Sequence, residues 1–330
     1  MMSKNIFKKI ISNGAKFAIS IILMAFVIRK AHFSKILEEL SHTSTYHVVA
    51  AFVIFIFTTI FLSVRWKIIT RPLNGRIPLW IYFKYFLYSY FFNNFLPTSI
   101  GGDIIRALKI KDYLEDRSHG FASVLVDRLL GILATLTYAT VGLYFTANLF
   151  KSGKIVYFAI VFSGLVALLL FILFNYTFYM KIRPGLLKIT VLRIGERLCK
   201  LIEAVHVYKS NKMLMFYGYI LSMLAQGSMV IINYYLLVGL GYQPSLGYLF
   251  FAIPVSFLVT LFPSINGLGI RDWSYVVLFS RIGIPVAASV SVAFLVVTIQ
   301  IVLSLFGGIL WLFEKENPKM ETIEEAAEEL

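Results

Sequence analysis

The amino-acid sequence predicts an all-α integral membrane protein. Hydrophobic residues occupy 59% of the 330 positions, whereas charged residues occupy only 15%. Soluble domains contain roughly 45–50% apolar and about 25% charged residues. This chain therefore has too little polar surface to cover itself in water. Because backbone groups in lipid must be satisfied within one segment, we expect its apolar stretches to be helices.

Six apolar stretches reach the length of about 20 residues that a helix needs to cross the hydrocarbon core. We expect full transmembrane helices at 14–33, 46–64, 121–147, 154–176, 213–238 and 285–313. The first follows four lysines, which gives it the appearance of a signal peptide. No small-residue cleavage site follows it, only Arg29 and Lys30, so we interpret it as a retained span.

Two further apolar stretches, 79–100 and 247–282, are interrupted by proline and glycine. Residues 94–103 read NFLPTSIGGD, and residues 263–272 read PSINGLGIRD. Proline and glycine end helices and allow the backbone to reverse. At membrane depth such backbone is tolerated only where protein or a watery cavity covers it. We therefore predict two re-entrant helical hairpins, with tips that meet near the membrane midplane.

The distribution of basic residues predicts the topology. The N-terminal segment, 65–78, 102–120, 181–212 and the C-terminal tail together hold 22 of the 31 Lys and Arg residues. Basic residues are retained on the cytoplasmic side of a cell membrane, so both termini are expected in the cytoplasm. The net charge of +14 then indicates contact with anionic lipid rather than with nucleic acid. Six full spans place the mouths of the two hairpins on opposite faces.

Opposed hairpins indicate an internal repeat. Both carry Pro-x-x-x-Gly followed by an aspartate and an arginine. Broken segments at matching positions in two halves of opposite topology point to a transporter binding site. We predict two inverted pseudo-repeats, about 1–150 and 151–313, within one membrane domain over 1–320. Chance is the alternative, because Pro-x-x-x-Gly by itself is common.

Two segments are expected at the surface. The basic segment 181–212 is either an amphipathic helix on the cytoplasmic leaflet or a solvated loop. The tail 321–330 contains five glutamates and is expected to be disordered.

Charged residues at membrane depth are the candidate functional residues. A charge at the centre of a spanning helix costs roughly 2.5–3.5 kcal/mol, so each needs a reason to be there. The candidates are Asp103, Arg106, Asp127, Arg128, Arg271 and Asp272. Asp103 and Arg106 share one helix face, whereas adjacent residues on a helix cannot face each other and must find partners elsewhere. Arginine offers a planar fork that suits phosphate, particularly beside glycine-rich helix starts.

A structural interpretation of these charges stays open. The aspartates and arginines can form ion pairs that hold the two halves together, and Asp103 can cap the helix that follows Gly102. Lys84 can extend to the cytoplasmic interface.

Enzyme signatures are absent from the sequence. It contains no nucleotide-binding glycine loop, no His-Glu-x-x-His and no Gly-x-Ser-x-Gly. The five histidines show no metal-binding spacing, and the single cysteine, Cys199, excludes an intramolecular disulfide. We expect no catalytic residue, metal or cofactor, and no direct use of ATP.

Taken together, these motifs resemble the lysylphosphatidylglycerol synthase transmembrane family, also called the flippase-like domain family. The matching pieces are Asn94-x-x-Pro97-x-x-x-Gly101-Gly102-Asp103-x-x-Arg106, Val126-Asp127-Arg128-Leu129-Leu130-Gly131, Pro263-x-x-x-Gly267-Leu268-Gly269-Ile270-Arg271-Asp272 and Gly307-Gly308. The resemblance covers nearly the whole chain. Two positions depart from the family pattern: Asp272 stands where glutamate is usual, and Gln300 falls where many members have arginine.

The resemblance implies a lipid-handling module with two pseudosymmetric halves. Some members move aminoacylated phospholipid between leaflets, and others are linked to polyprenyl-phosphate sugars or hopanoid lipids. The bifunctional members carry a soluble aminoacyltransferase domain after the membrane part, and we expect this protein to consist of the membrane part only.

The predicted function is to bind an anionic phospholipid or polyprenyl-phosphate-linked lipid and to assist its movement between leaflets. Arg106, Arg128 and Arg271 would hold the phosphate, and Asp103, Asp127 and Asp272 would orient them or bind a cationic headgroup. The backbone would approach closely at Asn94, Pro97, Gly101, Gly102, Pro263, Gly267 and Gly269. The alternatives are a membrane transferase acting on a lipid-phosphate sugar, and a non-catalytic partner of a lipid-modifying enzyme.

Overall fold

The protein is helical throughout the part of the chain that the structure describes. The computed structural model describes residues 33–73, 77–94, 101–114, 118–146, 175–188, 212–260 and 269–314, together with positions 164, 168, 171, 199 and 203. The α-helices are α2 (Phe33–Ser41), α3 (Thr45–Thr70), α4 (Leu79–Asn93), α5 (Gly101–Ile110), α6 (Ser118–Thr146), α8 (Tyr176–Leu187), α10 (Lys212–Gly239), α11 (Leu246–Val259), α12 (Ile270–Phe279) and α13 (Val286–Leu312). Single 3-10 turns cover Arg71–Leu73, Lys111–Tyr113 and Ser280–Ile282.

Four of these helices are long and apolar enough to cross a membrane. They cover Thr45–Leu73, His119–Thr146, Met213–Gly239 and Val286–Leu312. These helices confirm four of the six expected spans. The other two, 14–33 and 154–176, lie almost entirely outside the described residues.

The helix of the second span is longer than the predicted span. We expected it to stop at residue 64, but α3 continues to Thr70 because its buried face continues through Trp66 and Ile69. As a result Arg65 lies within the helix, and its side chain is buried in the protein.

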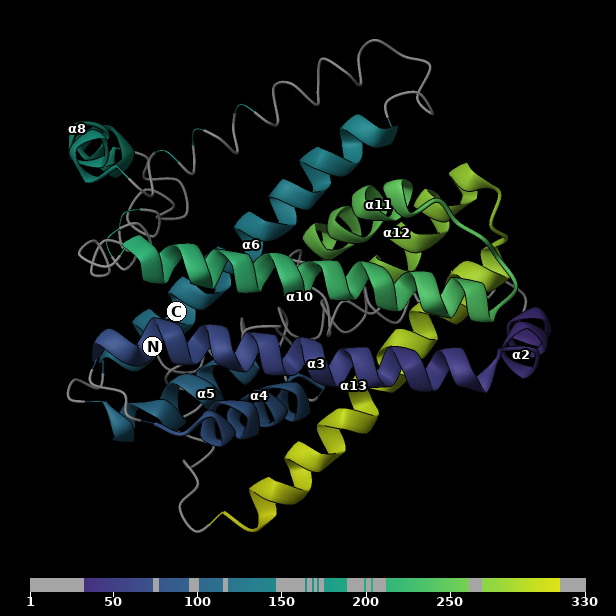
Figure 1. Cartoon of the computed structure of the whole chain (residues 1–330), viewed down its shortest axis with the longest axis horizontal. Coiled ribbons are helices and arrows are strands. Elements are labelled where there is room, and N and C mark those ends of the chain that lie inside the picture. The colour runs from purple at the N-terminus through teal and green to yellow at the C-terminus, as the bar shows by residue number, and fades with distance from the viewer. Residues whose placement is uncertain are drawn as a thin grey trace, which may run out of the picture.

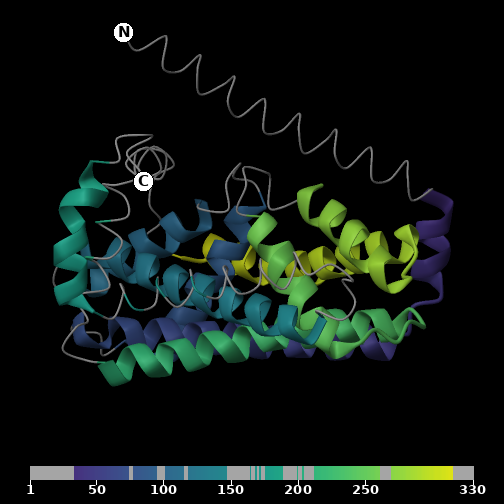
Figure 2. The ribbon, with the colours of Figure 1, turned by 90° about the horizontal axis from the view of Figure 1, so that it is seen from above.

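Both interrupted stretches consist of two shorter helices, as the proline and glycine clusters predict. Helix α4 packs against α5, and α11 packs against α12. The connecting residues 95–100 and 261–268, which include Pro97, Pro263 and Gly267, lie outside the described residues, as does the expected meeting of the tips. In Figures 1 and 2 the two helix pairs lie toward opposite ends of the long axis.

The helices follow the same order twice. Helices α3, α4, α5 and α6 have 26, 15, 10 and 29 residues, and α10, α11, α12 and α13 have 28, 14, 10 and 27. Helices α3 and α10 lie side by side and antiparallel (Figure 1), and the amide of Ser44 before α3 donates to the carbonyl of Gly239 at the end of α10. Helix α4 packs on α13, and α11 packs on α6.

Glycines allow these last two crossings. A Cβ atom at Gly307 of α13 would lie 2.2 Å from the carbonyl oxygen of Leu87 in α4. A Cβ atom at Gly142 of α6 would lie 2.3 Å from the backbone nitrogen of Phe251 in α11. Small residues let helix backbones approach this closely in membranes. Each pair of short helices is thus fixed against a long helix from the other part of the chain.

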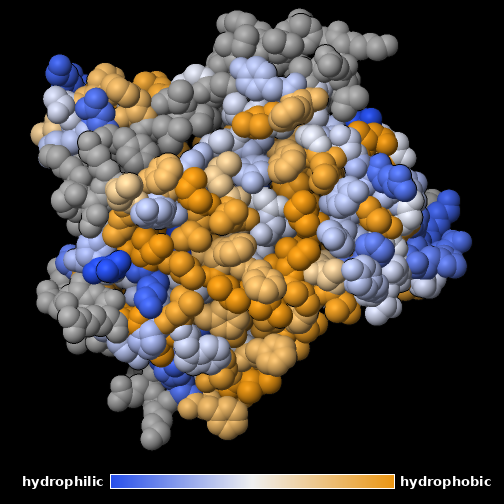
Figure 3. Space-filling model, viewed as in Figure 1, coloured by the Kyte–Doolittle hydropathy of each residue, from blue (hydrophilic) through white to orange (hydrophobic). Residues whose placement is uncertain are grey.

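The surface agrees with immersion in lipid. Figure 3 shows apolar side chains spread over the face formed by α3 and α10. Exposed large apolar residues there include Phe57, Phe216 and Leu224. An exposed apolar face of this size is unfavourable in water and expected against lipid.

Two predicted surface segments are only partly described. Helix α8 covers the beginning of 181–212, and the remainder lies outside the described residues except for positions 188, 199, 203 and 212. The tail 321–330 also lies outside them.

Candidate functional site

A network of buried charges joins α3, α5 and α6. All ten residues of α5 are buried, including Asp103 and Arg106. Arg65 from α3 and Asp127 from α6 are also buried, with exposed fractions of 5% and 1%. Because charges are rare in helices at membrane depth, their convergence from three helices has to be explained by pairing or by function.

Asp127 lies between two arginines. Its Oδ1 accepts a hydrogen bond from Nε of Arg65 at 2.6 Å, and its Oδ2 accepts one from Nη1 of Arg106 at 3.0 Å. Nη1 of Arg65 also donates to the hydroxyl of Ser222 in α10 at 2.9 Å. Both carboxylate oxygens of Asp127 therefore have charged donors, and α10 is connected to the network through a neutral group.

Asp103 lies between two arginines in the same way. Nε of Arg106 donates to Oδ1 of Asp103 at 2.8 Å, and Nε of Arg128 donates to Oδ2. The network alternates in sign from Arg65 to Asp127, Arg106, Asp103 and Arg128. Among the described residues the network contains three arginines and two aspartates.

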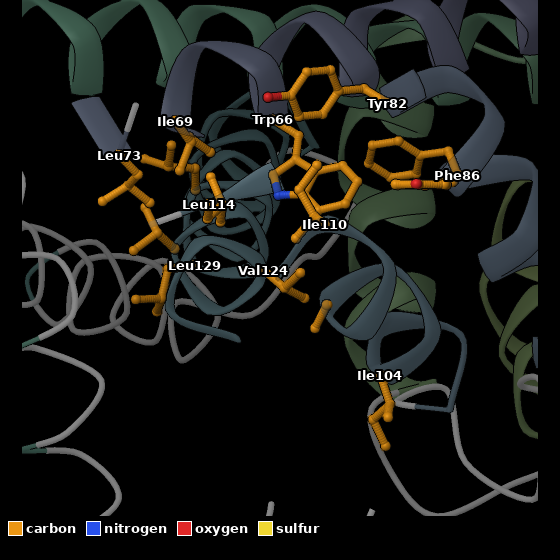
Figure 4. Close-up of a cluster of buried hydrophobic side chains, with 14 of the residues drawn as sticks. Trp66, Ile69, Leu73, Tyr82, Phe86, Ile104, Ile110, Leu114, Val124 and Leu129 are labelled. Carbon is orange, nitrogen blue, oxygen red and sulfur yellow. The ribbon is translucent and has the colours of Figure 1, made fainter. Parts of the chain in front are cut away.

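Aromatic side chains enclose the centre of this network. The guanidinium of Arg106 lies 4.5 Å from the ring centre of Phe86 and 5.0 Å from that of Trp66. Figure 4 shows Trp66 and Phe86 within the buried apolar cluster around α3, α4 and α5. The indole nitrogen of Trp66 donates to the hydroxyl of Ser123 at 3.0 Å. Apolar walls around Arg106 strengthen its pairing with the two aspartates.

These contacts show which of the predicted pairings form. Asp103 and Arg106 pair across one helix turn, and the adjacent Asp127 and Arg128 find partners on other helices, as expected. The oxygens of Asp103 accept from Arg106 and Arg128, and the side-chain oxygen of Asn93 accepts from the amide of Gly102. The residues before α5 that a cap by Asp103 would involve lie outside the described residues. Arg65 was missed because we placed it beyond the end of a span. The apolar residues Trp66, Ile68 and Ile69, which follow it, were the available signal.

Arg271 lies in a different environment, in the first turn of α12. It is 8% exposed, and its Nε and Nη2 atoms have no hydrogen-bond partner among the described residues. No described contact joins it to Arg106 or Arg128. The described structure therefore joins Arg106 and Arg128 through Asp103 and shows no direct contact between Arg271 and either of them.

The neighbouring Asp272 has a structural role. Its Oδ2 accepts a hydrogen bond from the amide of Gly269 at 2.7 Å, which caps the start of α12. Gly269 has a φ of 80°, a left-handed conformation that favours glycine. The local Gly-x-Arg-Asp sequence thus starts the helix and holds the backbone that carries Arg271.

Some of the residues at which we expected the backbone to approach a neighbour closely lie among the described residues. A Cβ atom at Gly102 would lie 2.2 Å from the carbonyl oxygen of Ser89, so the close approach at the start of α5 is to α4. Gly101 is buried in the same turn. Asn94 donates from Nδ2 to the hydroxyl of Ser304 at 2.9 Å, which ties the end of α4 to α13.

A second polar cluster ties the end of α13 to α4 and α5. Glu314 accepts hydrogen bonds from Nζ of Lys84 at 2.8 Å and from the hydroxyl of Tyr88 at 2.7 Å. Nζ of Lys109 lies 3.7 Å from the same carboxylate and 5.2 Å from the ring centre of Trp311. Lys84, which we expected to extend to the interface, pairs with a glutamate just beyond the last span.

Glu314→Gln is expected to lower stability by about 1 kcal/mol at neutral pH, because the cluster is partly exposed. Burial alone raises the pKa of Glu314, but hydrogen bonds from Lys84 and Tyr88 and the charges of Lys84 and Lys109 outweigh it and leave the pKa below its ordinary value. A depressed carboxyl pKa stabilises the fold above the ordinary glutamate range and loses that effect as the pH falls. The midpoint of thermal unfolding should therefore differ from wild type above about pH 5, and the difference should shrink as the pH falls through and below the ordinary glutamate range.

Glu38→Gln is the matched control, because Glu38 is an exposed carboxylate. Its unfolding midpoint should follow wild type over the same pH range. A difference between Glu314→Gln and wild type that does not depend on pH would contradict this account of the cluster.

The arrangement of Asp103 and Asp127 can be compared with what a metal-dependent enzyme would need. Such an enzyme would need carboxylates that converge without an arginine between them. Arg106 instead donates to both Asp103 and Asp127. Among the described residues no group of three or more His, Cys, Asp and Glu side chains has the arrangement of a metal site.

The family and a relative of the chain are known. The family model for the lysylphosphatidylglycerol synthase TM region matches residues 14–308. A UPF0104 membrane protein from Methanocaldococcus jannaschii is 29% identical over 206 residues, which cover 61% of this chain and 57% of the relative. The chain thus aligns with little more than half of that relative's length. No solved structure gives a significant match. The chain belongs to the lysylphosphatidylglycerol synthase TM region family and is a multi-pass helical membrane protein.

Proposed function

We propose that this protein binds the anionic headgroup of a membrane phospholipid or polyprenyl-phosphate-linked lipid and assists its movement between leaflets. The observation that carries the proposal is Arg271, a buried arginine whose Nε and Nη2 lack partners among the described residues. Membership of a lipid-related membrane family supports a lipid as the ligand. No nucleotide-binding sequence is present, so movement would follow the lipid gradient or be coupled to an ion.

An unpaired buried arginine is costly. Arginine stays charged in proteins, so it cannot avoid the cost by losing its proton. Buried charges are normally paired, and a group that keeps free donors at this depth is expected to receive an acceptor from a ligand. Phosphate fits, because its oxygens match the guanidinium fork and because anions are favoured near a helix N-terminus.

The first group of helices, α3 to α6, and the second, α10 to α13, differ in the charged residues that they contain, and this difference supports the same proposal. Helix α6 packs on α5 and supplies Asp127 and Arg128 to the first group's network. Helix α13 packs on α12 in the corresponding way, but it contains no Asp, Glu, Lys or Arg between Val286 and Leu312. In the first group each of the three arginines pairs with at least one carboxylate of the protein. In the second group the corresponding helix offers none to Arg271.

We further propose that the two groups of helices are inverted repeats, within halves of about 1–150 and 151–313. Their helices match in order and length, α3 and α10 are antiparallel, and the α4–α13 and α11–α6 crossings correspond. In this arrangement α4–α5 and α11–α12 are re-entrant hairpins that enter from opposite sides. Two further spans, at 14–33 and 154–176, complete six, with both termini in the cytoplasm and the protein in the cell membrane.

The closed network suggests a division of roles among the predicted residues. Asp103 and Asp127 orient Arg106 and Arg128, and the network holds α3, α5 and α6 together. A non-catalytic partner of a lipid-modifying enzyme would also have such closed ion pairs. Arg271 distinguishes the two functions, because a purely structural arginine would be expected to have a protein partner.

Arg271→Ala is expected to reduce binding of phosphatidylglycerol by about tenfold, since one charge-assisted contact is worth roughly 1.5–3 kcal/mol. Arg271→Lys should also bind less tightly, because lysine lacks the bidentate fork. Stability should be kept, since no described partner loses a contact at Nε or Nη2. Binding and translocation are measured on purified protein reconstituted in vesicles of phosphatidylcholine with labelled phosphatidylglycerol.

Arg281→Ala is the matched control, because Arg281 is an exposed arginine shortly after α12. It removes the same net charge and should leave binding unchanged. Wild-type binding and translocation by a folded Arg271→Ala protein would exclude the headgroup role.

A further inference from the structure

Three donors from α4 and α5 converge on the carboxylate of Glu314. Nζ of Lys84 donates to both carboxylate oxygens, at 3.1 and 2.8 Å, and the hydroxyl of Tyr88 donates to Oε2 at 2.7 Å. Nζ of Lys109 lies 3.7 Å from Oε1. Lys84 and Tyr88 are four residues apart on α4, so they share a helix face, and α4 packs on α5. Two neighbouring helices thus direct two ammonium groups and one hydroxyl at a single anion.

These donors are held in place by groups other than the carboxylate. The side chains of Lys84 and Lys109 are mostly buried. Nζ of Lys109 lies 5.2 Å from the ring centre of Trp311. Nζ of Lys84 lies 5.9 Å from the ring centre of Tyr88. Aromatic rings at these distances attract an ammonium group, so the donors stay around the same point when the carboxylate leaves, and such a preorganised site binds an anion at lower cost.

The end of α13 does little to hold Glu314 in this position. Glu314 follows the last turn of α13, and the two side chains before it, Leu312 and Phe313, are exposed. A negative charge is disfavoured at a helix C-terminus, so α13 itself gives no reason for a carboxylate here. The side chain of Glu314 is also 21% exposed, which leaves its carboxylate accessible. Segments with few buried contacts open locally at low cost, so another anion can take its place.

We propose that Lys84, Tyr88 and Lys109 form a phosphate-binding site, and that Glu314 occupies it as an internal competitor. The ligand is the phosphate group of an anionic lipid or of a soluble phosphate ester. Phosphate suits the site because it offers several anionic oxygens to two ammonium groups and a hydroxyl, and lysine binds phosphate as a point charge. The site shares no described contact with Arg271 and does not depend on the proposed function.

Glu314→Gln and Glu314→Ala test the site in an Arg271→Ala background, which removes the arginine of the proposed function. The probes are short-chain phosphatidic acid and glycerol phosphate, two phosphate monoesters that differ in their acyl chains. Calorimetry on the purified full chain in neutral detergent measures their binding. Both Glu314 variants should bind at least one probe about tenfold more tightly than the Arg271→Ala parent. Tighter binding of phosphatidic acid identifies a lipid as the ligand, and tighter or equal binding of glycerol phosphate identifies a soluble ester.

Lys109→Gln combined with Glu314→Gln should return the affinity to that of the parent or below, because it removes one ammonium group. Glu38→Gln is the matched control, since it removes an exposed carboxylate elsewhere and should leave the affinity unchanged. If neither Glu314 variant folds, the parent is titrated to high concentrations of phosphatidic acid, and Lys109→Gln should weaken that binding.

Equal affinity of the parent and both Glu314 variants, or tighter binding that survives Lys109→Gln, would overturn the site and leave the role of Arg271 untouched. The role of Arg271 fails separately, when Arg271→Ala does not weaken the binding of phosphatidylglycerol by the otherwise unchanged chain.

Discussion

Asp127→Ala is expected to destabilise the protein by roughly 3–5 kcal/mol, because it breaks a buried ion pair by removing one partner only. The carboxylate of Asp127 accepts from Arg65 and Arg106 at 2.6 and 3.0 Å and is 1% exposed. Without it Arg65 keeps its charge but has no carboxylate partner among the described residues. The expected result is a large drop in the midpoint of thermal unfolding of the purified protein and poor yield from membranes.

The control is Glu38→Ala, which removes an exposed carboxylate and should leave the midpoint unchanged. Removal of Arg65 as well, in Arg65→Leu with Asp127→Leu, should be less damaging than Asp127→Ala, because Arg65 is then gone and Arg106 still pairs with Asp103. An Asp127→Ala protein as stable as wild type would show that the network does not hold α3, α5 and α6 together.

Gly307→Ala is expected to separate α13 from α4. The added Cβ would lie 2.2 Å from the carbonyl oxygen and 2.5 Å from the carbonyl carbon of Leu87, and backbone atoms cannot turn away as a flexible side chain can. Overpacking usually costs about 1–3 kcal/mol, and contact with backbone places this site at or above the upper end. Thermal unfolding and the yield of monodisperse protein measure the effect.

Gly142→Ala should behave similarly, because its Cβ would meet the backbone of Phe250 and Phe251 at the α6–α11 crossing. Gly185→Ala is the control, since a Cβ there has no neighbour within 4 Å. Alanine also favours helix over glycine, so this control should be neutral or slightly stabilising. Wild-type stability in Gly307→Ala would mean that the α4–α13 crossing is not as close as the structure has it.

Asp103, Arg106, Asp127 and Arg128 show how far the sequence could go. Their positions in apolar stretches marked them as groups that need a partner, and helix geometry predicted the pairing of Asp103 with Arg106. The sequence could not say that Arg106 also pairs with Asp127, because that contact depends on how α5 packs against α6. Arg65 and Ser222 escaped notice for the same reason: each becomes important only through a neighbour that is distant in sequence.

Composition and hydrophobic patterning by themselves determined the helical membrane class and four long apolar helices, because both depend on the hydrophobicity of local segments. Proline and glycine by themselves determined the two interrupted stretches, because they limit which backbone conformations are possible. Tertiary structure decided which charges are neutralised. Arg106 and Arg271 follow similar motifs, yet α6 brings a carboxylate to Arg106 and α13 brings none to Arg271. The sequence determines which residues are charged, but the packing of helices that lie far apart along the chain determines which residues pair.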